Sequence, residues 1–503
     1  MAAILAPFGF RDVRRADAHL QEMAKDPLDR ALLAELVGEI LECVSRSADP
    51  DQSLALLERV SAASLGRREL YDHLVRSPAT LEVLTRAFGA SPFVAEVLVR
   101  HPGYLYWVCE PNVLRSVRSR DAVRSELASA LGPFGTEEKR LDALRVFKRR
   151  ELLHIAVRDI LRLARVEETL AALSELAEVL IEAAYQVSLE EALRATGAAL
   201  PAGPHASGYA VVALGKLGGG ELNFSSDVDL LYVYSSDRGR APGTAIARPA
   251  FYDRLSRRLT AALGANTSEG HVFRVDLRLR PEGRMGSLAY SVPAMRRYYA
   301  SRGSTWERLA LLKAWPVAGD PSVGARFLRT VRPFVFGAPF GPEAFGAVLR
   351  LRGQIAAQVE GRGEGRTNVK LGTGGIREIE FVTQALQARH GRKAPALRQR
   401  GTLAALAALR AAGLLPSAEH DVLSRAYLFL RDVENKLQMV ADAQVHALPQ
   451  DPVLLRGLAR TLGYRHAAGH DALRQFESDY AGHTAAVNEV FTRVFGGAGA
   501  QPG

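Results

Sequence analysis

Apolar residues recur along much of the chain at spacings of three and four, which is the period of an amphipathic helix. Leu33, Leu36 and Ile40 give a clear example near the N-terminus. Further stretches with this pattern are residues 137–165, residues 167–196 and most of the chain after Val292. The pattern therefore predicts a chain that is mainly helical.

A smaller part of the chain has the pattern of strands. The apolar runs Tyr209–Leu214 and Leu230–Tyr234 lie on either side of GKLGGGELNFSSDVD, which fills positions 215–229. Residues 271–280 are predicted as a strand, because apolar and polar side chains alternate from Phe273 to Arg280, and Leu288–Ser291 is predicted as a shorter strand. The expected fold class is α+β, predominantly helical, with a small mixed β-sheet.

The chain has 503 residues, which is more than one ordinary core can organise, so several domains are expected. The predicted divisions are an N-terminal helical region over residues 1–135, a sheet-containing domain over 136–335, a C-terminal helical domain over 336–495 and a disordered tail, GGAGAQPG, over 496–503.

Composition excludes some classes of protein. No run approaches eighteen apolar residues, so no membrane span is predicted, and the N-terminus lacks the pattern of a signal peptide. The two cysteines, Cys43 and Cys109, are too few for a disulfide framework, which favours a cytoplasmic location. The formal net charge of +10 comes from scattered arginines, as expected for helix surfaces or for a polyanionic ligand such as a nucleotide. Nucleic acid is the less favoured partner.

Candidate chemistry begins at the strand that follows the glycine-rich stretch. Asp227 and Asp229 are separated by one residue, so a strand directs both carboxylates to the same face. Two such carboxylates repel each other unless a cation lies between them, and carboxylate oxygens suit Mg²⁺ or Mn²⁺. Gly215, Gly218 and Gly219 allow backbone N–H groups to approach an anion closely. Together these features predict a nucleotide phosphate site.

The alternating segment 271–280 supplies further candidates. A strand there directs Asp276, Arg278 and Arg280 to one face. If this strand lies beside the Asp227–Asp229 strand, three carboxylates can hold two Mg²⁺ ions for nucleotidyl transfer. The two arginines can then clamp phosphate oxygens, unless they pair with surface carboxylates instead.

Two other loop residues are candidate ligands for the nucleotide. Lys216 can offer a point charge to a phosphate, and Ser226 can either cap the turn or act as a ligand. A purely structural role remains open for both.

The motifs around these residues resemble a known family. Gly215, followed after ten residues by the sequence SDVD, resembles the DNA polymerase beta type nucleotidyltransferase superfamily, although Lys216 stands where serine is common. The longer motifs resemble the glutamine synthetase adenylyltransferase and adenylyl-removing enzyme family from about Ser53 to Leu448. They are GKLGGGELNFSSDVDL, RVDLRLRPEG, YYASRGSTWERLALLKA and GTGGIREIEFVTQ.

The resemblance implies a nucleotidyltransferase core between helical domains, with Asp227 and Asp229 as the metal-binding pair and Asp276 as the third carboxylate. Family members usually carry two such halves. One half removes AMP from a tyrosine of glutamine synthetase by phosphorolysis and releases ADP. The other adds AMP from ATP and releases pyrophosphate.

This chain has one set of motifs, and it resembles the N-terminal, AMP-removing half. The partners implied are glutamine synthetase and a PII-type signalling protein. Arg377, Glu380 and Gln384 share helical spacings of three and four, so that their face of the helix can look into the cleft. Glu307, Arg308 and Lys313 can line it too, and a local ion pair on a helix surface is the alternative role for each.

Three alternative functions remain open at the level of sequence. The first is the opposite direction, ATP-dependent adenylylation of glutamine synthetase. The second is nucleotidyl transfer to another acceptor, such as an RNA end or a small antibiotic. The third is a regulatory module without activity, against which the intact Asp227, Asp229 and Asp276 argue.

Overall fold

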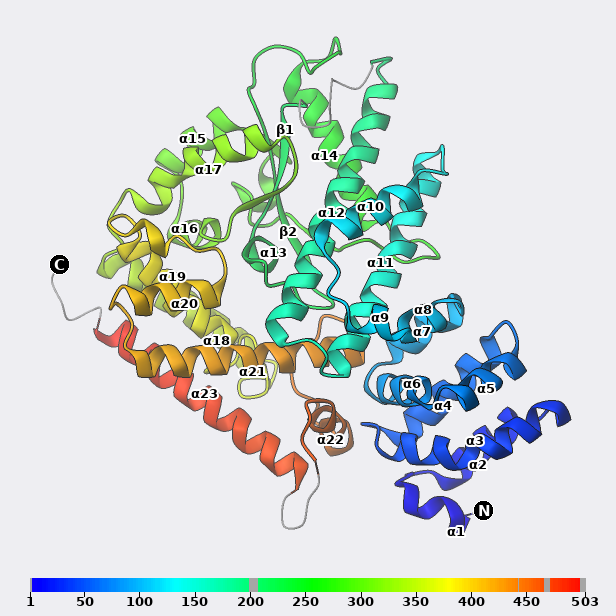
Figure 1. The fold of residues 1–503 in the computed structure, drawn as a ribbon. Helices are drawn as coiled ribbons and strands as arrows, with labels where there is room; N and C mark the ends of the chain where they lie inside the picture. Colours follow the sequence, from blue (N-terminus) through cyan, green and yellow to red (C-terminus); the bar gives the residue numbers. More distant parts are fainter. Residues whose placement is uncertain (1, 199–206, 442, 466–470, 498–503) are drawn as a thin grey trace. The chain divides into compact units, whose positions relative to one another are not determined.

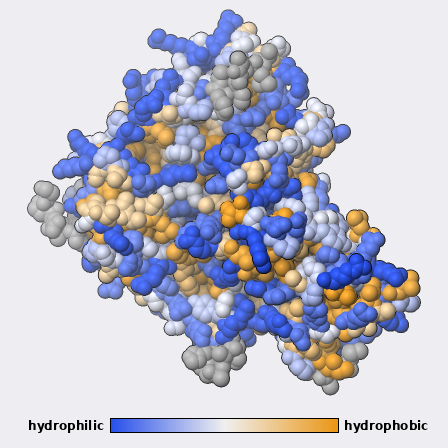
Figure 2. Space-filling model, viewed as in Figure 1, coloured by the Kyte–Doolittle hydropathy of each residue, from blue (hydrophilic) through white to orange (hydrophobic). Residues whose placement is uncertain are grey.

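The computed structural model describes residues 2–198, 207–441, 443–465 and 471–497 (Figure 1). Over these residues the predicted fold class is confirmed, because most of the chain is helical and the strands form a small mixed sheet. No helix in this part of the chain is both long enough and apolar enough to cross a membrane. On the face shown in Figure 2, polar residues surround smaller apolar areas.

The chain forms two compact units. Unit 1 comprises Met1–Val117, Arg149–Thr169 and Arg431–Ala481, and unit 2 comprises Arg118–Lys148, Leu170–Leu430 and Gly482–Gly503. The domain boundaries predicted from sequence stay predictions. Of the predicted tail, Gly496 and Gly497 end a helix, and residues 498–503 lie outside the described residues.

Unit 1 is built mainly from short helices that begin at proline. Asp26 and Asp49 stand directly before two of these prolines, and their carboxylates accept hydrogen bonds from N–H groups of the first turn. Proline loses no hydrogen bond at the first helical position, so these pairs start helices sharply. The helices are α1 (Ala2–Leu5), η1 (Ala6–Phe8), α2 (Val13–Met23), α3 (Pro27–Ser45), α4 (Pro50–Ala63), α5 (Arg67–Arg76), α6 (Pro78–Ala90), α7 (Pro92–Arg100), α8 (Tyr104–Cys109), α9 (Pro111–Arg115) and α22 (Pro452–Thr461).

Unit 2 contains the sheet, with strand order β3-β2-β1-β5 and with β4 also paired to β2. Strand β1 is antiparallel to β2 and β5, whereas β2 is parallel to β3 and β4. The bounds are β1 (Tyr209–Ala213), β2 (Val228–Tyr234), β3 (Val275–Asp276), β4 (Ala289–Ser291) and β5 (Trp315–Gly319).

The helices of unit 2 surround this sheet. They are α10 (Arg120–Leu131), α13 (Gly215–Gly219), α14 (Arg248–Gly264), η3 (Gly283–Met285), α15 (Val292–Ser301), α16 (Thr305–Leu311), α17 (Pro321–Phe336), α18 (Pro342–Glu360), α19 (Ile376–His390), η4 (Pro395–Leu397) and α20 (Thr402–Ala411). Four long helices have residues in both units, namely α11 (Glu137–Ile160), α12 (Val166–Arg194), α21 (Ser417–Ala441) and α23 (Ala472–Gly497).

Both faces of the central strands are buried, which explains why β1 and β2 are nearly continuous apolar runs. On one face Val212 and Val233 pack against Met295 of α15 and Phe327 of α17. On the other, Tyr209 stacks against tyrosines from α12, β2 and α14. Alternate residues of each strand therefore anchor helices on opposite sides, and the end of β2 that carries Asp229 is held rigidly.

The predicted strand over 271–280 is wrong for most of its length, since only Val275 and Asp276 are in β3. Asp276 accepts a hydrogen bond from the backbone N–H of Arg278 at 2.8 Å, a local turn that ends the strand. The guanidinium of Arg280 donates to the carbonyls of Leu277, Arg284 and Gly286 and holds the following loop. Asp276, Arg278 and Arg280 therefore do not share a strand face.

The glycine-rich stretch also differs from the predicted loop, because Gly215–Gly219 forms the short helix α13. Gly215 enters it with φ of +56°, and Gly220 ends it with φ of +71°, both in the left-handed region that favours glycine. The chain thus turns sharply between β1 and the corner that leads to Asp227.

Candidate active site

The centre of the candidate site is a pair of aspartates on adjacent parallel strands. Asp229 of β2 and Asp276 of β3 are register partners. Paired residues of parallel strands direct their side chains to the same face of a sheet. The peptide oxygen of Asp229 also accepts from the N–H of Leu214 at 2.9 Å, which joins this position to the start of α13.

The carboxyl group of Asp229 has a raised pKa. Burial is the main cause and the neighbouring Asp276 adds to it, Lys370 and Arg377 counteract part of the rise, and the resulting pKa is about 6. A carboxylate that is desolvated and close to another carboxylate is a favourable place for a cation. The cation offsets both the cost of burying the negative charge and the repulsion between the two carboxylates.

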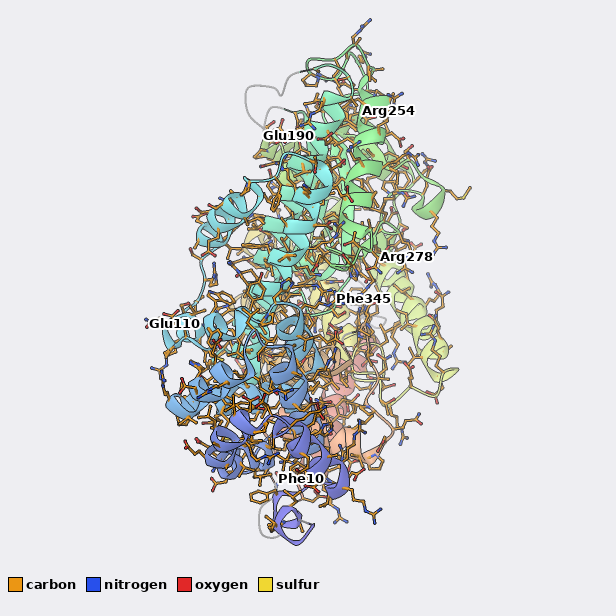
Figure 3. All side chains as sticks on the ribbon, turned by 90° about the vertical axis from the view of Figure 1, so that its right-hand side faces the viewer. Phe10, Glu110, Glu190, Arg254, Arg278 and Phe345 are labelled. Atoms are coloured by element: carbon orange, nitrogen blue, oxygen red, sulfur yellow. The ribbon has the colours of Figure 1, made fainter. Side chains whose placement is uncertain are left out.

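The other two aspartates are engaged with arginines. Asp227 accepts from Nε of Arg274 at 2.7 Å, and Asp276 accepts from Nε of Arg278 at 2.8 Å. Burial alone opposes ionisation of Asp276, but the hydrogen bonds and the charge of Arg278 hold its pKa below the ordinary value. The side chain of Arg278, labelled in Figure 3, is 66% exposed, so its ion pair is of the weak surface kind.

These residues fit a hard divalent cation in their chemistry. As the side chains stand, no three acidic, histidine or cysteine groups in the described part of the chain are arranged to hold a metal ion. The exposed Arg278 can leave Asp276 at little cost, which frees a carboxylate beside Asp229. Mg²⁺ or Mn²⁺ bound by Asp227, Asp229 and Asp276 therefore remains the prediction for this site.

Gly215 is required by the position of Asp229. A Cβ atom at residue 215 would lie 2.3 Å from Oδ2 of Asp229, and its φ of +56° already disfavours any other residue. We expect Gly215→Ala to displace the carboxylate, to lower transfer activity roughly tenfold to a hundredfold and to cost about 1–2 kcal/mol of stability. Steady-state kinetics and urea unfolding measure the two effects. Gly353→Ala, at an open position, is the control.

The remaining glycines shape the loop. A Cβ atom at Gly218 would lie 2.1 Å from the carbonyl oxygen of Lys313, so this glycine lets α13 pack against the segment before β5. A Cβ atom at Gly219 would lie 2.9 Å from Oε2 of Glu221. Contacts of both residues with a nucleotide stay predictions.

The other predicted ligands have varied surroundings. Ser226 is buried, and its Oγ accepts from the N–H of Asn223 at 3.1 Å, which fixes the corner before β2. Lys216 is half-buried on α13, and its carbonyl accepts from the N–H of Glu221. Arg280 is committed to the three loop carbonyls described above.

Two cations near Asp229 come from a distant part of the sequence. The predicted cleft face of α19 included Arg377, but Lys370, in the loop before it, was missed. The N–H of Arg377 donates to the carbonyl of Lys370 at 2.9 Å, so one turn presents both side chains. The glycines of GTGG, which allow that tight turn, were the available signal, but only the folded chain brings them close to Asp229.

A buried ionic cluster fixes this cationic turn. Nζ of Lys313 lies 2.8 Å from carboxylate oxygens of both Glu221 and Glu380 and 3.2 Å from Oγ1 of Thr402. Glu380 in turn pairs with Arg377 at 3.3 Å. Although burial opposes the charges, the two carboxylates raise the pKa of Lys313, and Lys313 lowers that of Glu380. Lys313 is thus a link between the segment after α13, α19 and α20 rather than an open cleft residue.

Two residues expected to line the cleft have structural roles. Glu307 accepts from the N–H and hydroxyl of Ser304 in a capping box at the start of α16. The guanidinium of Arg308 donates to the carbonyls of Val335 and Ala338. Both side chains are buried, and they organise helix ends instead of a ligand site.

The structure thus brings acidic residues of adjacent strands together beside a glycine turn on a small mixed sheet. Residues 81–330 match the family model described as glutamate-ammonia ligase adenylyltransferase. Over the matched residues the chain belongs to this family. Residues 350–495 match the model described as GlnD PII-uridylyltransferase.

Two curated relatives share much of the sequence. Each is named bifunctional glutamine synthetase adenylyltransferase/adenylyl-removing enzyme. The chain is 37% identical over 415 residues to the protein of Thioalkalivibrio sulfidiphilus (strain HL-EbGR7) and 39% identical over 376 residues to that of Xanthomonas axonopodis pv. citri (strain 306). The matches cover 82% and 75% of this chain but 42% and 39% of the relatives, so the chain spans about two fifths of their length.

Proposed function

We propose that this chain removes AMP from a modified tyrosine of glutamine synthetase, with inorganic phosphate as the acceptor and ADP as the product. The observation that carries the proposal is the Asp229–Asp276 pair below Gly215, within electrostatic reach of Lys370 and Arg377. The names of the two relatives support the substrate, and the likeness of the motifs to the AMP-removing half supports the direction.

In the proposed reaction an oxygen of phosphate forms a bond to the phosphorus of AMP. The bond between that phosphorus and the tyrosine oxygen breaks, and the tyrosine oxygen takes the electron pair and then a proton. Lys370 and Arg377 supply positive charge that attracts the incoming phosphate and offsets its repulsion by the carboxylates. A divalent cation held by Asp227, Asp229 and Asp276 would stabilise negative charge on the transferring group.

The charges near Asp229 favour removal over addition, since Lys370 and Arg377 supply positive charge there. ATP-dependent adenylylation starts from a neutral tyrosine hydroxyl, which needs a base. Phosphorolysis brings an anionic nucleophile that needs cations more than a base. Adenylylation remains the alternative function.

Nucleotide contacts are proposed for residues around the glycine turn and β3. Lys216 on α13 and the exposed Arg278 would bind phosphate oxygens, Gly215 and Gly219 would allow close approach, and Ser226, Gly218 and Arg280 would hold the loop. A PII-type signalling protein is proposed as a second partner, supported by the description of the model that matches residues 350–495.

The test of direction uses the full chain with purified glutamine synthetase. AMP-modified synthetase, phosphate and Mg²⁺ should yield ADP and unmodified synthetase. In the reverse arm, unmodified synthetase is mixed with ATP and pyrophosphate is measured. Pyrophosphate without any ADP would establish the adenylylation alternative, and inactivity in both arms would refute the proposed substrate.

The raised pKa of Asp229 predicts how Mg²⁺ binding depends on pH. The folded carboxyl holds its proton up to about pH 6, so a cation competes with that proton below this value. We expect the apparent affinity to be level from pH 7 to 8 and to fall up to about tenfold per pH unit below 6. Calorimetry in buffers of different ionisation enthalpy measures the proton released. An affinity for Mg²⁺ that is unchanged at pH 5 would show that Asp229 is not a ligand of the cation.

A further inference from the structure

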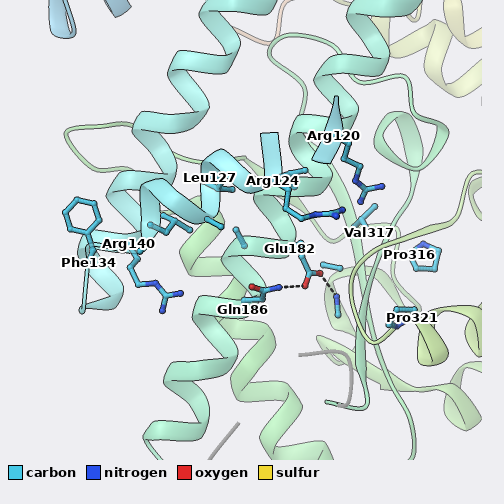
Figure 4. A pocket seen from close by; sticks show the side chains of 17 residues that line it. Arg120, Arg124, Leu127, Phe134, Arg140, Glu182, Gln186, Pro316, Val317 and Pro321 are labelled. Carbon is cyan, nitrogen blue, oxygen red and sulfur yellow. Dashed lines mark hydrogen bonds between the residues drawn. The ribbon is translucent and has the colours of Figure 1, made fainter. Parts of the chain in front are cut away.

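A large cavity lies in unit 2 away from the two aspartates. It has a volume of about 750 Å³ and is bounded by α10, α12, the segment after α10 and strand β5 (Figure 4). Leu127, Leu131, Val179 and Val317 supply apolar wall. This volume and this composition are typical of sites for small organic molecules.

The polar groups of the cavity are mainly hydrogen-bond donors. Arg120, Arg124 and Arg140 line it, and in Figure 4 the first two extend from α10 toward Val317. Each has one carboxylate partner outside the lining, namely Glu178, Asp121 and Glu190. A guanidinium has five N–H donors, so these pairs leave donors to spare. Nε of Arg120 is buried and has no hydrogen-bond partner among the described residues.

The one carboxylate in the wall is already used. Glu182 accepts from the backbone N–H of Gly319 at 2.8 Å and from Nε2 of Gln186 at 2.8 Å (Figure 4). Its negative charge is therefore directed to the protein and not to the space beside the arginines. An occupant that satisfies the remaining donors must be an acceptor, and an anion does so best.

The geometry of β5 argues against a peptide as the occupant. Strand β5 is at the edge of the sheet, where an added strand would need regularly spaced backbone N–H groups. Pro316 has no N–H, and the N–H of Gly319 is capped by Glu182. Proline and capped edges block strand addition, so the cavity suits a compact ligand.

We propose that this cavity binds a small amphipathic anion, with its apolar part against Leu127, Leu131 and Val317 and its carboxylate or phosphate against Arg120 and Arg124. The site is separate from the proposed transfer site and does not depend on the reaction assigned there. Its wall includes residues 316–319 of β5, the strand that begins two residues after Lys313.

The test uses the full chain and three probes with the same apolar tail: octanoate, octyl phosphate and octanol. Calorimetry should show saturable one-to-one binding of at least one anion, with octanol much weaker. A preference for octanoate or octyl phosphate identifies the head group, and similar affinities support the shared anionic chemistry. Octanol binding as tightly as both anions, or no saturable binding at millimolar concentration, would overturn the proposal.

Three variants locate the site. Arg120→Gln with Arg124→Gln should weaken anion binding roughly tenfold to a hundredfold, since charge-assisted hydrogen bonds are lost. Ala183→Phe, which fills the cavity and keeps the arginines, should abolish binding even if the double variant folds poorly. Arg257→Gln, at an exposed arginine of α14, should bind as the parent does. Unchanged affinity in the cavity-filled variant would refute this location.

Discussion

Asp229→Asn is expected to reduce AMP removal by roughly 10³-fold or more while making the metal-free protein more stable at pH 7. Activity falls because asparagine keeps the shape of the side chain but cannot supply a charged oxygen to a cation. Stability rises because the buried carboxylate, near Asp276, is ionised at a cost that asparagine avoids.

The sign of the stability change follows from the pKa. The carboxyl of Asp229 titrates at about 6 in the folded chain against 3.8 for the ordinary group, so the folded state binds the proton more tightly. The parent protein therefore loses stability as pH rises from about 4 to about 6, and the whole loss is present at pH 7. Two pKa units correspond to roughly 3 kcal/mol, and we expect about 2 kcal/mol because the side chain keeps some solvent contact.

Thermal unfolding at several pH values, with and without Mg²⁺, measures this prediction. The gain in Asp229→Asn should vanish below about pH 4, and Mg²⁺ should stabilise the parent but not the variant. Asp253→Asn, at an exposed position of α14, is the matched control and should change neither quantity. Full transfer activity in the Asp229→Asn variant would show that Asp229 has no role in the reaction.

The apolar pattern predicts the central part of the fold well. Strands β1 and β2 are buried on both faces, so their sequences are continuous apolar runs that few other structures produce. Segment 271–280 fails for a physical reason. Its backbone is held by contacts other than a strand ladder, since the N–H groups of Val272 and Phe273 donate to the carbonyl of Leu263 and Asp276 closes a turn with Arg278.

In the site, too, features set by neighbouring residues can be predicted from the sequence, whereas contacts between residues far apart in the sequence cannot. The spacing of Asp227 and Asp229 is local and can be read from the sequence, although Asp227 lies just before β2. The place of Asp276 beside Asp229 depends on the pairing of β2 with β3, which the sequence offers only as a condition. The partners of these groups do not follow from the sequence either. Arg274 and Arg278 hold two of the carboxylates, and Lys370 comes within electrostatic range of the third only in the folded chain. No spacing in the sequence encodes such a placement.

The buried ionic cluster leads to the second large prediction. Lys313→Met should lower the free energy of unfolding by about 3–5 kcal/mol, because it leaves the buried carboxylates of Glu221 and Glu380 without their shared cation. Methionine has a similar length, so lost packing contributes little. Urea unfolding measures the change, and Lys393→Met, at an exposed lysine of the same unit, is the control.

The pH dependence of Lys313→Met distinguishes lost charge from lost shape. In the parent, Lys313 lowers the pKa of Glu380, so the stability from this pair is present at neutral pH and is lost only as pH falls through the lowered pKa. In the variant the two carboxylates repel and retain protons, so the variant gains stability as pH falls toward 5. The difference between parent and variant should therefore narrow on acidification. A difference that stays constant with pH would indicate a packing defect.

The same substitution should also lower transfer activity at urea concentrations where the variant is still folded. Glu380 holds Arg377 at 3.3 Å, and Glu221 caps the N–H of Thr402 at the start of α20. Without Lys313 the carboxylates of Glu221 and Glu380 repel each other and move apart. Arg377, which pairs with Glu380, then loses its fixed position near Asp229. Since Arg377 is proposed to attract phosphate, we expect the substitution to raise the KM for phosphate more than the KM for modified glutamine synthetase. Adding Glu380→Gln to Lys313→Met should recover part of the stability but not the KM, because the repulsion is removed while Arg377 stays unanchored.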